Sequence, residues 1–144
     1  MDAAKYSLDA NMLVYAVDNA VQEKHSRAVQ LLTDLAEHSS VLTLQALGEF
    51  YHVVTRKKLL STEIASEIIE EWTTLFPVVS AQPPMLARAI HATRKHQIPF
   101  WDAMLWATAR EAGVTVLFSE DFQHGQTMGG VRFCNPFLEK NPLG

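Results

Sequence analysis

The chain has 144 residues, of which 48% are hydrophobic and 19% are charged, and these shares are typical of a globular protein rather than a disordered one. A chain of this length typically buries about 70% of the surface that its unfolded form exposes, so we expect a single domain over residues 1–144. The formal charge of −4 excludes a uniformly basic surface for nucleic acid and leaves only a local basic patch for such contacts.

The first half of the chain predicts short strands that alternate with helices. We expect a strand over residues 5–9, a helix over 11–18, and a helix over 25–37 in which apolar residues recur at helical spacing. A brief strand over 41–43 is expected to lead into a helix over 44–58. Three basic residues close that helix, where positive charge suits the helix dipole.

The second half continues the same alternation. Ser61 or Thr62 is expected to cap a helix that runs to residue 76, followed by a strand over 77–80. Prolines 83 and 84 start a helix that ends near 96, and Gly113 stops a helix over 101–112. Strands are expected over 114–119 and 131–134. The pattern predicts a three-layer α/β/α sandwich around a mostly parallel sheet of about five strands.

Cysteine content and apolar segment length bear on the cellular compartment. Cys134 is the only cysteine, which excludes an internal disulfide and a thiolate zinc cage and favours a reducing compartment. No segment reaches the length needed to span a bilayer, and the N-terminus lacks the pattern of a signal peptide. We therefore expect a cytoplasmic protein that does not enter the membrane.

Four acidic residues stand out by position. Asp9 and Asp121 each follow a predicted strand, and the carboxyl ends of neighbouring parallel strands meet at one edge of a sheet. Glu49 and Asp102 are lone carboxylates in predicted helices that are otherwise apolar. A lone charge in such a place is costly unless something compensates it. If the four converge, a divalent cation is the natural compensation.

The ligand type indicates which cation would suit such a site. Carboxylate oxygens without accompanying His or Cys favour magnesium or manganese over zinc. A cation of this kind can activate water for attack on a phosphate. Each acid also has a simpler possible role: Asp9 as a helix cap, Asp102 as a partner of the helix dipole, and Glu49 as a side chain that reaches solvent.

The motifs that contain these acids resemble a known family. The segments SLDANMLVYAVD, EFYHVVTRK, WDAMLWATAREAG and LFSEDFQHGQ resemble, in order and spacing, the successive motifs of PIN-domain proteins, in particular the toxin ribonucleases of the VapC type. The resemblance implies magnesium- or manganese-dependent hydrolysis of RNA phosphodiesters by the toxin of a toxin-antitoxin pair. It also implies an antitoxin protein as partner, and homodimerisation is expected as well.

The resemblance also implies roles for individual residues. The four acids of the PIN-domain motifs correspond to Asp9, Glu49, Asp102 and Asp121. We expect Asp9, Asp102 and Asp121 to be direct metal ligands and Glu49 to act through water. Asn11 and Ser119 match the polar residues that support the acids.

The last motif leaves one choice open, because Glu120 and Asp121 are adjacent and either could be the fourth acid. Strand alternation would place Asp121 on the same side as Ser119, so we favour Asp121. Arg56 and Lys57 could contact RNA phosphates, although serving the helix dipole is an equally good explanation. Trp101 and Trp106 could stack on bases, but packing in the core or at a subunit interface is favoured.

Two alternatives belong to other functional classes. A haloacid dehalogenase-like phosphohydrolase also places Asp after its first strand, but it needs a second Asp two positions on, where this chain has Asn11. The other alternative is a catalytically inert PIN-fold protein that serves only to bind a partner.

Overall fold

A parallel sheet forms the centre of the molecule. The structure is a computed structural model that describes residues 3–143. Its main sheet has four strands in the order β1-β4-β6-β5, in which only β5 runs antiparallel to its neighbour. Their bounds are β1 Tyr6–Leu8, β4 Val116–Phe118, β5 Thr127–Met128 and β6 Val131–Cys134. Two further strands, β2 (Leu42–Thr43) and β3 (Val78–Val79), form a separate parallel pair. A single bridge from Tyr6 to Ser40 links β1 to the segment that leads into β2.

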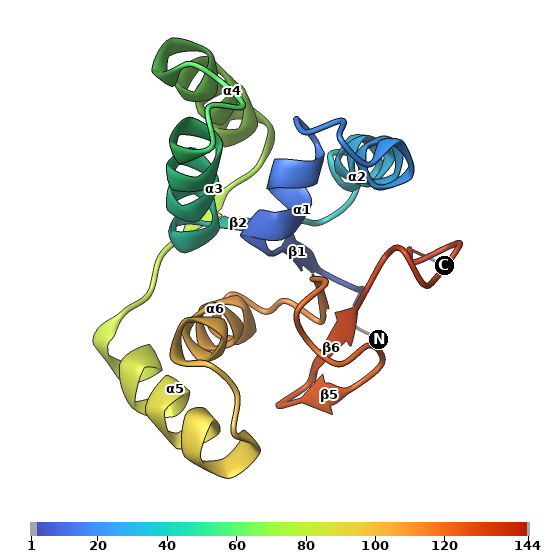
Figure 1. Ribbon diagram of the computed structural model, residues 1–144. Coiled ribbons are helices and arrows are strands. Elements are labelled where there is room, and N and C mark those ends of the chain that lie inside the picture. The colour runs from blue at the N-terminus through green and yellow to red at the C-terminus, as the bar shows by residue number, and fades with distance from the viewer. Residues whose placement is uncertain (1–2, 144) are drawn as a thin grey trace.

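Helices cover both faces of this sheet. Figure 1 shows α1–α4 on one side and α5 and α6 on the other. The helices are α1 (Ala10–Tyr15), α2 (Gln22–Leu35), α3 (Leu44–Arg56), α4 (Thr62–Leu75), α5 (Pro83–His96) and α6 (Phe100–Glu111). Of the helices within residues 3–143, none is both long and apolar enough to cross a bilayer.

Strand alternation divides the interior into two apolar cores. In β4, Val116 and Phe118 belong to the core under α1–α4, while Leu117 between them belongs to the core under α5 and α6. Phe50 and Phe133 anchor the two cores and are fully buried. The predicted three-layer α/β/α class is therefore confirmed.

The strand count differs from the prediction of about five strands in one sheet. The structure has a four-stranded sheet and a separate two-stranded one. The unpredicted strand β5 is only two residues long and turns into β6 through Gly129 and Gly130, both at positive φ. Two residues are too few to show an alternating pattern, which explains why the sequence did not reveal β5.

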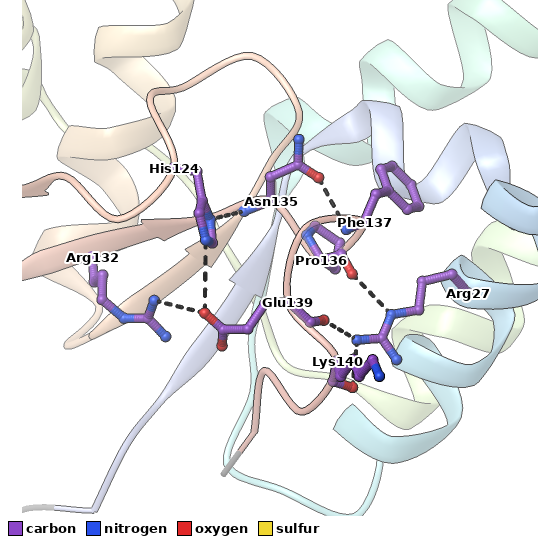
Figure 2. Close-up of polar contacts among 8 residues, drawn as sticks. All are labelled: Arg27, His124, Arg132, Asn135, Pro136, Phe137, Glu139 and Lys140. Carbon is purple, nitrogen blue, oxygen red and sulfur yellow. Dashed lines mark hydrogen bonds and ion pairs between the residues drawn. The ribbon is translucent and has the colours of Figure 1, made fainter.

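The segment after β6 is attached to α2 through one arginine (Figure 2). Arg27 Nε donates to the carbonyl of Pro136 at 2.9 Å, and its Nη2 donates to the carbonyls of Glu139 and Lys140. Next to it, His124 Nδ1 accepts a hydrogen bond from the Asn135 backbone N–H at 3.0 Å. These contacts fix the last part of the chain against α2 and against the loop after β4.

Candidate active site

Two side chains meet where β1 and β4 end. Because these strands are parallel neighbours with Leu8 opposite Phe118, the residues that follow them, Asp9 and Ser119, lie at the same edge. Ser119 Oγ donates to Asp9 Oδ2 at 2.8 Å. Asp9 Oδ1 accepts from the Ala10 N–H at 2.7 Å, so the same carboxylate also caps α1. The helix-cap role and a site role are thus compatible.

Asp121 is placed by a turn. Strand alternation was the wrong reason for expecting it beside Ser119, because β4 already ends at Phe118. Instead, Ser119 Oγ accepts a hydrogen bond from the Asp121 N–H at 3.0 Å, which folds the chain into a short turn. One hydroxyl therefore holds both Asp9 and Asp121.

Asp102 completes a group of three carboxylates. It lies in the first turn of α6, which starts directly after Pro99. One carboxylate oxygen from each of Asp9, Asp102 and Asp121 lies within 4.8 Å of the other two. Within residues 3–143, no Lys, Arg or His side chain forms an ion pair with any of the three. The group therefore concentrates negative charge that the described protein does not neutralise.

The electrostatics of the group reflect this concentration. Desolvation raises the pKa of Asp9 from 3.8 to about 6; hydrogen bonds from Ser119 and Ala10 oppose the rise, and the charges of Asp121 and Asp102 add to it. The pKa of Asp102 is also raised, first by desolvation and then by the charges of Asp121 and Glu49. Binding a cation would relieve both effects.

Glu49 borders the same cleft but is not part of the three-carboxylate group. It projects from α3, and its Oε1 accepts from Gln45 Nε2 at 2.9 Å. The same Gln45 amide donates to the Trp101 carbonyl at 2.9 Å, so it ties α3 to the start of α6. Sequence reasoning missed Gln45, although its position four residues before Glu49 permits this contact on a helix.

Glu120 points elsewhere. It forms an ion pair with Lys24 and accepts a hydrogen bond from Tyr15 Oη at 2.7 Å. Desolvation works against its ionisation, but the hydrogen bonds from Lys24 and Tyr15 outweigh this and lower its pKa. The Lys24 ammonium also lies over the Tyr15 ring, 5.1 Å from its centroid. These contacts leave Asp121, rather than Glu120, beside Asp9 and Asp102.

Asp9 and Asp121 line a cleft of about 890 Å³ whose walls come from α1, α3 and the start of α6, and Asp102 directly follows the cleft residue Trp101 in the chain. Asn11, His52 and Lys57 line it, whereas Arg56 does not. Asn11 makes no hydrogen bond to the acids, and both polar atoms of its amide are buried without a partner. A buried amide in this state is costly unless water or a ligand satisfies it. The cleft thus has the oxygen ligands and the unsatisfied polar group that a hydrated hard cation would use.

A second group of possible metal ligands, His124, Cys134 and Glu139, fits a metal poorly. The Nδ1 lone pair of His124 already accepts from a backbone N–H, so its other nitrogen carries the proton. Burial raises the pKa of the Cys134 thiol to about 11, and Arg132 already faces Glu139 at 3.5 Å. We assign this group to holding the C-terminal segment.

Fold and site together define a class: a three-layer α/β/α domain that gathers carboxylates at the carboxyl edge of a parallel sheet. The sequence model of the PIN domain matches residues 6–127. The chain belongs to the PIN domain family, which confirms the family prediction.

Several solved structures share this fold. VapC20 of Mycobacterium tuberculosis, a sarcin-ricin loop cleaving toxin, is 19% identical with a TM-score of 0.65, over 81% of this chain and 91% of that chain. FitAcB from Neisseria gonorrhoeae is 19% identical with a TM-score of 0.62, over 92% and 98%. VapBC-1 from nontypeable Haemophilus influenzae is 17% identical with a TM-score of 0.63, over 92% and 98%. At these identities the likeness concerns the fold. No curated protein sequence matches the chain.

Proposed function

We propose that this protein is a magnesium- or manganese-dependent endoribonuclease, the toxin of a toxin-antitoxin pair, and that residues 1–144 act as a single domain. The observation that carries the proposal is the convergence of Asp9, Asp102 and Asp121 within 4.8 Å at the side of an open cleft. The fold shared with VapC toxins supports the choice of RNA as substrate.

The residues of the site would have different roles in phosphodiester hydrolysis. Asp9, Asp102 and Asp121 would hold the cation, and Ser119 donates to the Asp9 carboxylate and accepts from the Asp121 backbone N–H. A bound divalent cation would supply charge neutralisation at the phosphate and activation of a water molecule. Glu49, which accepts a hydrogen bond from Gln45, would orient that water. In the reaction, water adds to phosphorus and the bond to one ribose oxygen breaks.

The direct test is incubation of defined RNAs with the purified protein, with and without a chelator. We expect wild type to cleave with magnesium or manganese, and the chelator to abolish cleavage. Asp9→Asn should fold but lose at least about 100-fold in rate, because it removes a ligand charge at the cation. Cleavage by Asp9→Asn at the wild-type rate would contradict the proposal.

We further propose a cognate antitoxin that covers the cleft, and a homodimer in the cytoplasm. The fold shared with a toxin-antitoxin complex from Klebsiella pneumoniae supports the antitoxin. The exposed Leu44, Tyr51 and Val78 border an apolar groove between α3 and β3, which supports a protein contact on that side. Light scattering that finds only a monomer at high concentration would argue against the dimer.

The family match bears differently on the two alternative functions. The PIN match leaves the haloacid dehalogenase reading without support from the family. The inert binding protein stays as the rival that the cleavage assay tests, and absence of both metal binding and cleavage would favour it.

A further inference from the structure

The three tryptophans of this chain have different environments. Trp72 and Trp106 are 8% and 7% exposed, and Trp106 Nε1 donates to the Met128 carbonyl at 3.0 Å. Packing is therefore the right account of Trp106. Trp101, in contrast, is 62% exposed and lines the cleft beside the carboxylates. Its indole contributes little to the core, so its position calls for another explanation.

Trp101 is held in place although it is exposed. The Phe100 ring packs edge-on against it, with centroids 4.9 Å apart. Its carbonyl accepts the hydrogen bond from Gln45, whose amide also holds Glu49. Its chain neighbour is Asp102, one of the three converging acids. The base of the indole is thus fixed relative to the acidic site, which is the arrangement that a preorganised binding platform requires.

Gly48 leaves part of the α3 wall of the cleft without a side chain. Gly48 lies inside α3, where glycine destabilises a helix relative to alanine. A Cβ at Gly48 would meet no heavy atom within 4 Å, so nothing in the described structure requires glycine there. Gly48 lines the same cleft as Trp101. The missing side chain leaves room for a flat group close to the helix backbone.

The charges along α3 indicate what kind of ligand the cleft suits. Glu49, Val53 and Lys57 lie on one helical face and all line the cleft. Lys57 lies about 12 Å from Glu49 along the helix axis. The cleft therefore combines the proposed cation site, a basic side chain about two helical turns away along α3 and an aromatic ring, which suits a chain of phosphates and bases.

We propose that Trp101 is a stacking platform for an unpaired nucleobase next to the scissile phosphate. This inference rests on the nuclease function proposed above. In a duplex both faces of each base are covered by their neighbours, whereas an unpaired base can leave the stack and lie on an indole. Stacking of this kind tolerates any base.

Intrinsic fluorescence tests the platform without requiring catalysis. Oligouridine RNA, added to the full chain in the presence of a chelator, should quench tryptophan emission. Trp101→Phe should lose most of this quenching. Trp72→Phe is the matched control and should keep it, because Trp72 is buried against Phe50 and lies outside the cleft. Equal quenching in wild type and Trp101→Phe would overturn the proposal.

Kinetics provide the second readout. Trp101→Ala should raise KM for single-stranded RNA by about 5- to 150-fold, with a smaller change in kcat, and Trp101→Phe should restore most of the loss. The same sequence in a duplex should be a poorer substrate. A KM for Trp101→Ala within twofold of wild type would overturn the proposal. A third result would also overturn the proposal. If Trp101→Ala changes the molar mass of the protein in solution but leaves RNA quenching unchanged, Trp101 contacts a second protein chain instead of RNA.

The two proposals fail in different ways. Quenching that depends on Trp101 without any RNA hydrolysis would remove the nuclease function and keep the RNA platform. Hydrolysis that is indifferent to Trp101 would keep the nuclease and remove the platform.

Discussion

Glu120 and Asp121 are neighbours in the chain with opposite environments. Glu120 is paired with Lys24 and Tyr15, while Asp121 is exposed beside Asp9 and Asp102. The difference arises from one residue, because the Ser119 hydroxyl binds the Asp121 N–H and sets the turn. The two side chains are therefore a natural matched pair for mutation.

We predict that Asp121→Asn lowers the rate of RNA cleavage at least about 10-fold, because it would remove a negative charge from the proposed cation site. Glu120→Gln should stay within about threefold of wild-type activity, since its carboxylate faces Lys24 instead. Single-turnover cleavage of one RNA by both variants measures the difference. The reverse order of effects would show that Glu120 is the functional acid.

Asp9 makes the metal-free protein sensitive to pH. Its folded pKa is about 6 against an ordinary value of 3.8, so the folded state holds the proton more tightly than the unfolded state. Between these two pH values the unfolded state therefore loses its proton first. Stability falls as pH rises through this window, by up to about 3 kcal/mol from this residue.

Asp9→Asn should remove this part of the pH dependence. With a chelator present, the free energy of unfolding of wild type should fall relative to that of Asp9→Asn between about pH 4 and pH 7. Urea denaturation at a series of pH values measures both proteins. Parallel curves would show that burial does not raise the pKa of Asp9.

At the scale of elements, Gly48 makes helix α3 less stable where the helix lines the cleft. Gly48→Ala should raise the free energy of unfolding by about 0.5–1 kcal/mol, because alanine favours helix and the new Cβ meets open space. Thermal denaturation of the variant measures this gain. If Gly48 leaves room for substrate, the same variant should also have a higher KM for RNA. A lower melting temperature would mean that the glycine has a structural role.

Most elements were predictable from local patterns. Helices α3, α5 and α6 lie within two residues of the predicted ranges, because an apolar stripe, prolines or glycine mark their limits. Helix α2 begins three residues before the predicted start, at Gln22. Its first turn is Gln22, Glu23 and Lys24, and polar residues of this kind carry no apolar periodicity.

The site was only partly visible in the sequence. Asp9 and Asp121 stood out because each follows a strand, and Glu49 and Asp102 because their helices are apolar. The contact of Gln45 with Trp101, and the pairing of Glu120 with Lys24, depend on how distant segments pack. No local pattern carries that information. The same holds for the difference in exposure between Trp101 and Trp106.

At the scale of the whole molecule, Arg27 attaches the C-terminal segment to α2 by donating hydrogen bonds to three of its backbone carbonyls. Arg27→Met should lower the free energy of unfolding by about 1–3 kcal/mol, since partly buried carbonyls lose a charged donor. Arg88→Met is the control, because Arg88 forms only an exposed ion pair with Glu111, and about 0–1 kcal/mol is expected. Equal effects in chemical denaturation would show that the Arg27 hydrogen bonds add no more to stability than an exposed ion pair does.

The central claim is that carboxylates from the residue after β1, the start of α6 and the turn after β4 share one divalent cation. Isothermal titration calorimetry with manganese tests it most directly, on the metal-free protein. We predict saturable binding to wild type and to Glu120→Gln, and at least about tenfold weaker binding to Asp102→Asn. No saturable binding to wild type, or equal binding to Asp102→Asn, would contradict the account.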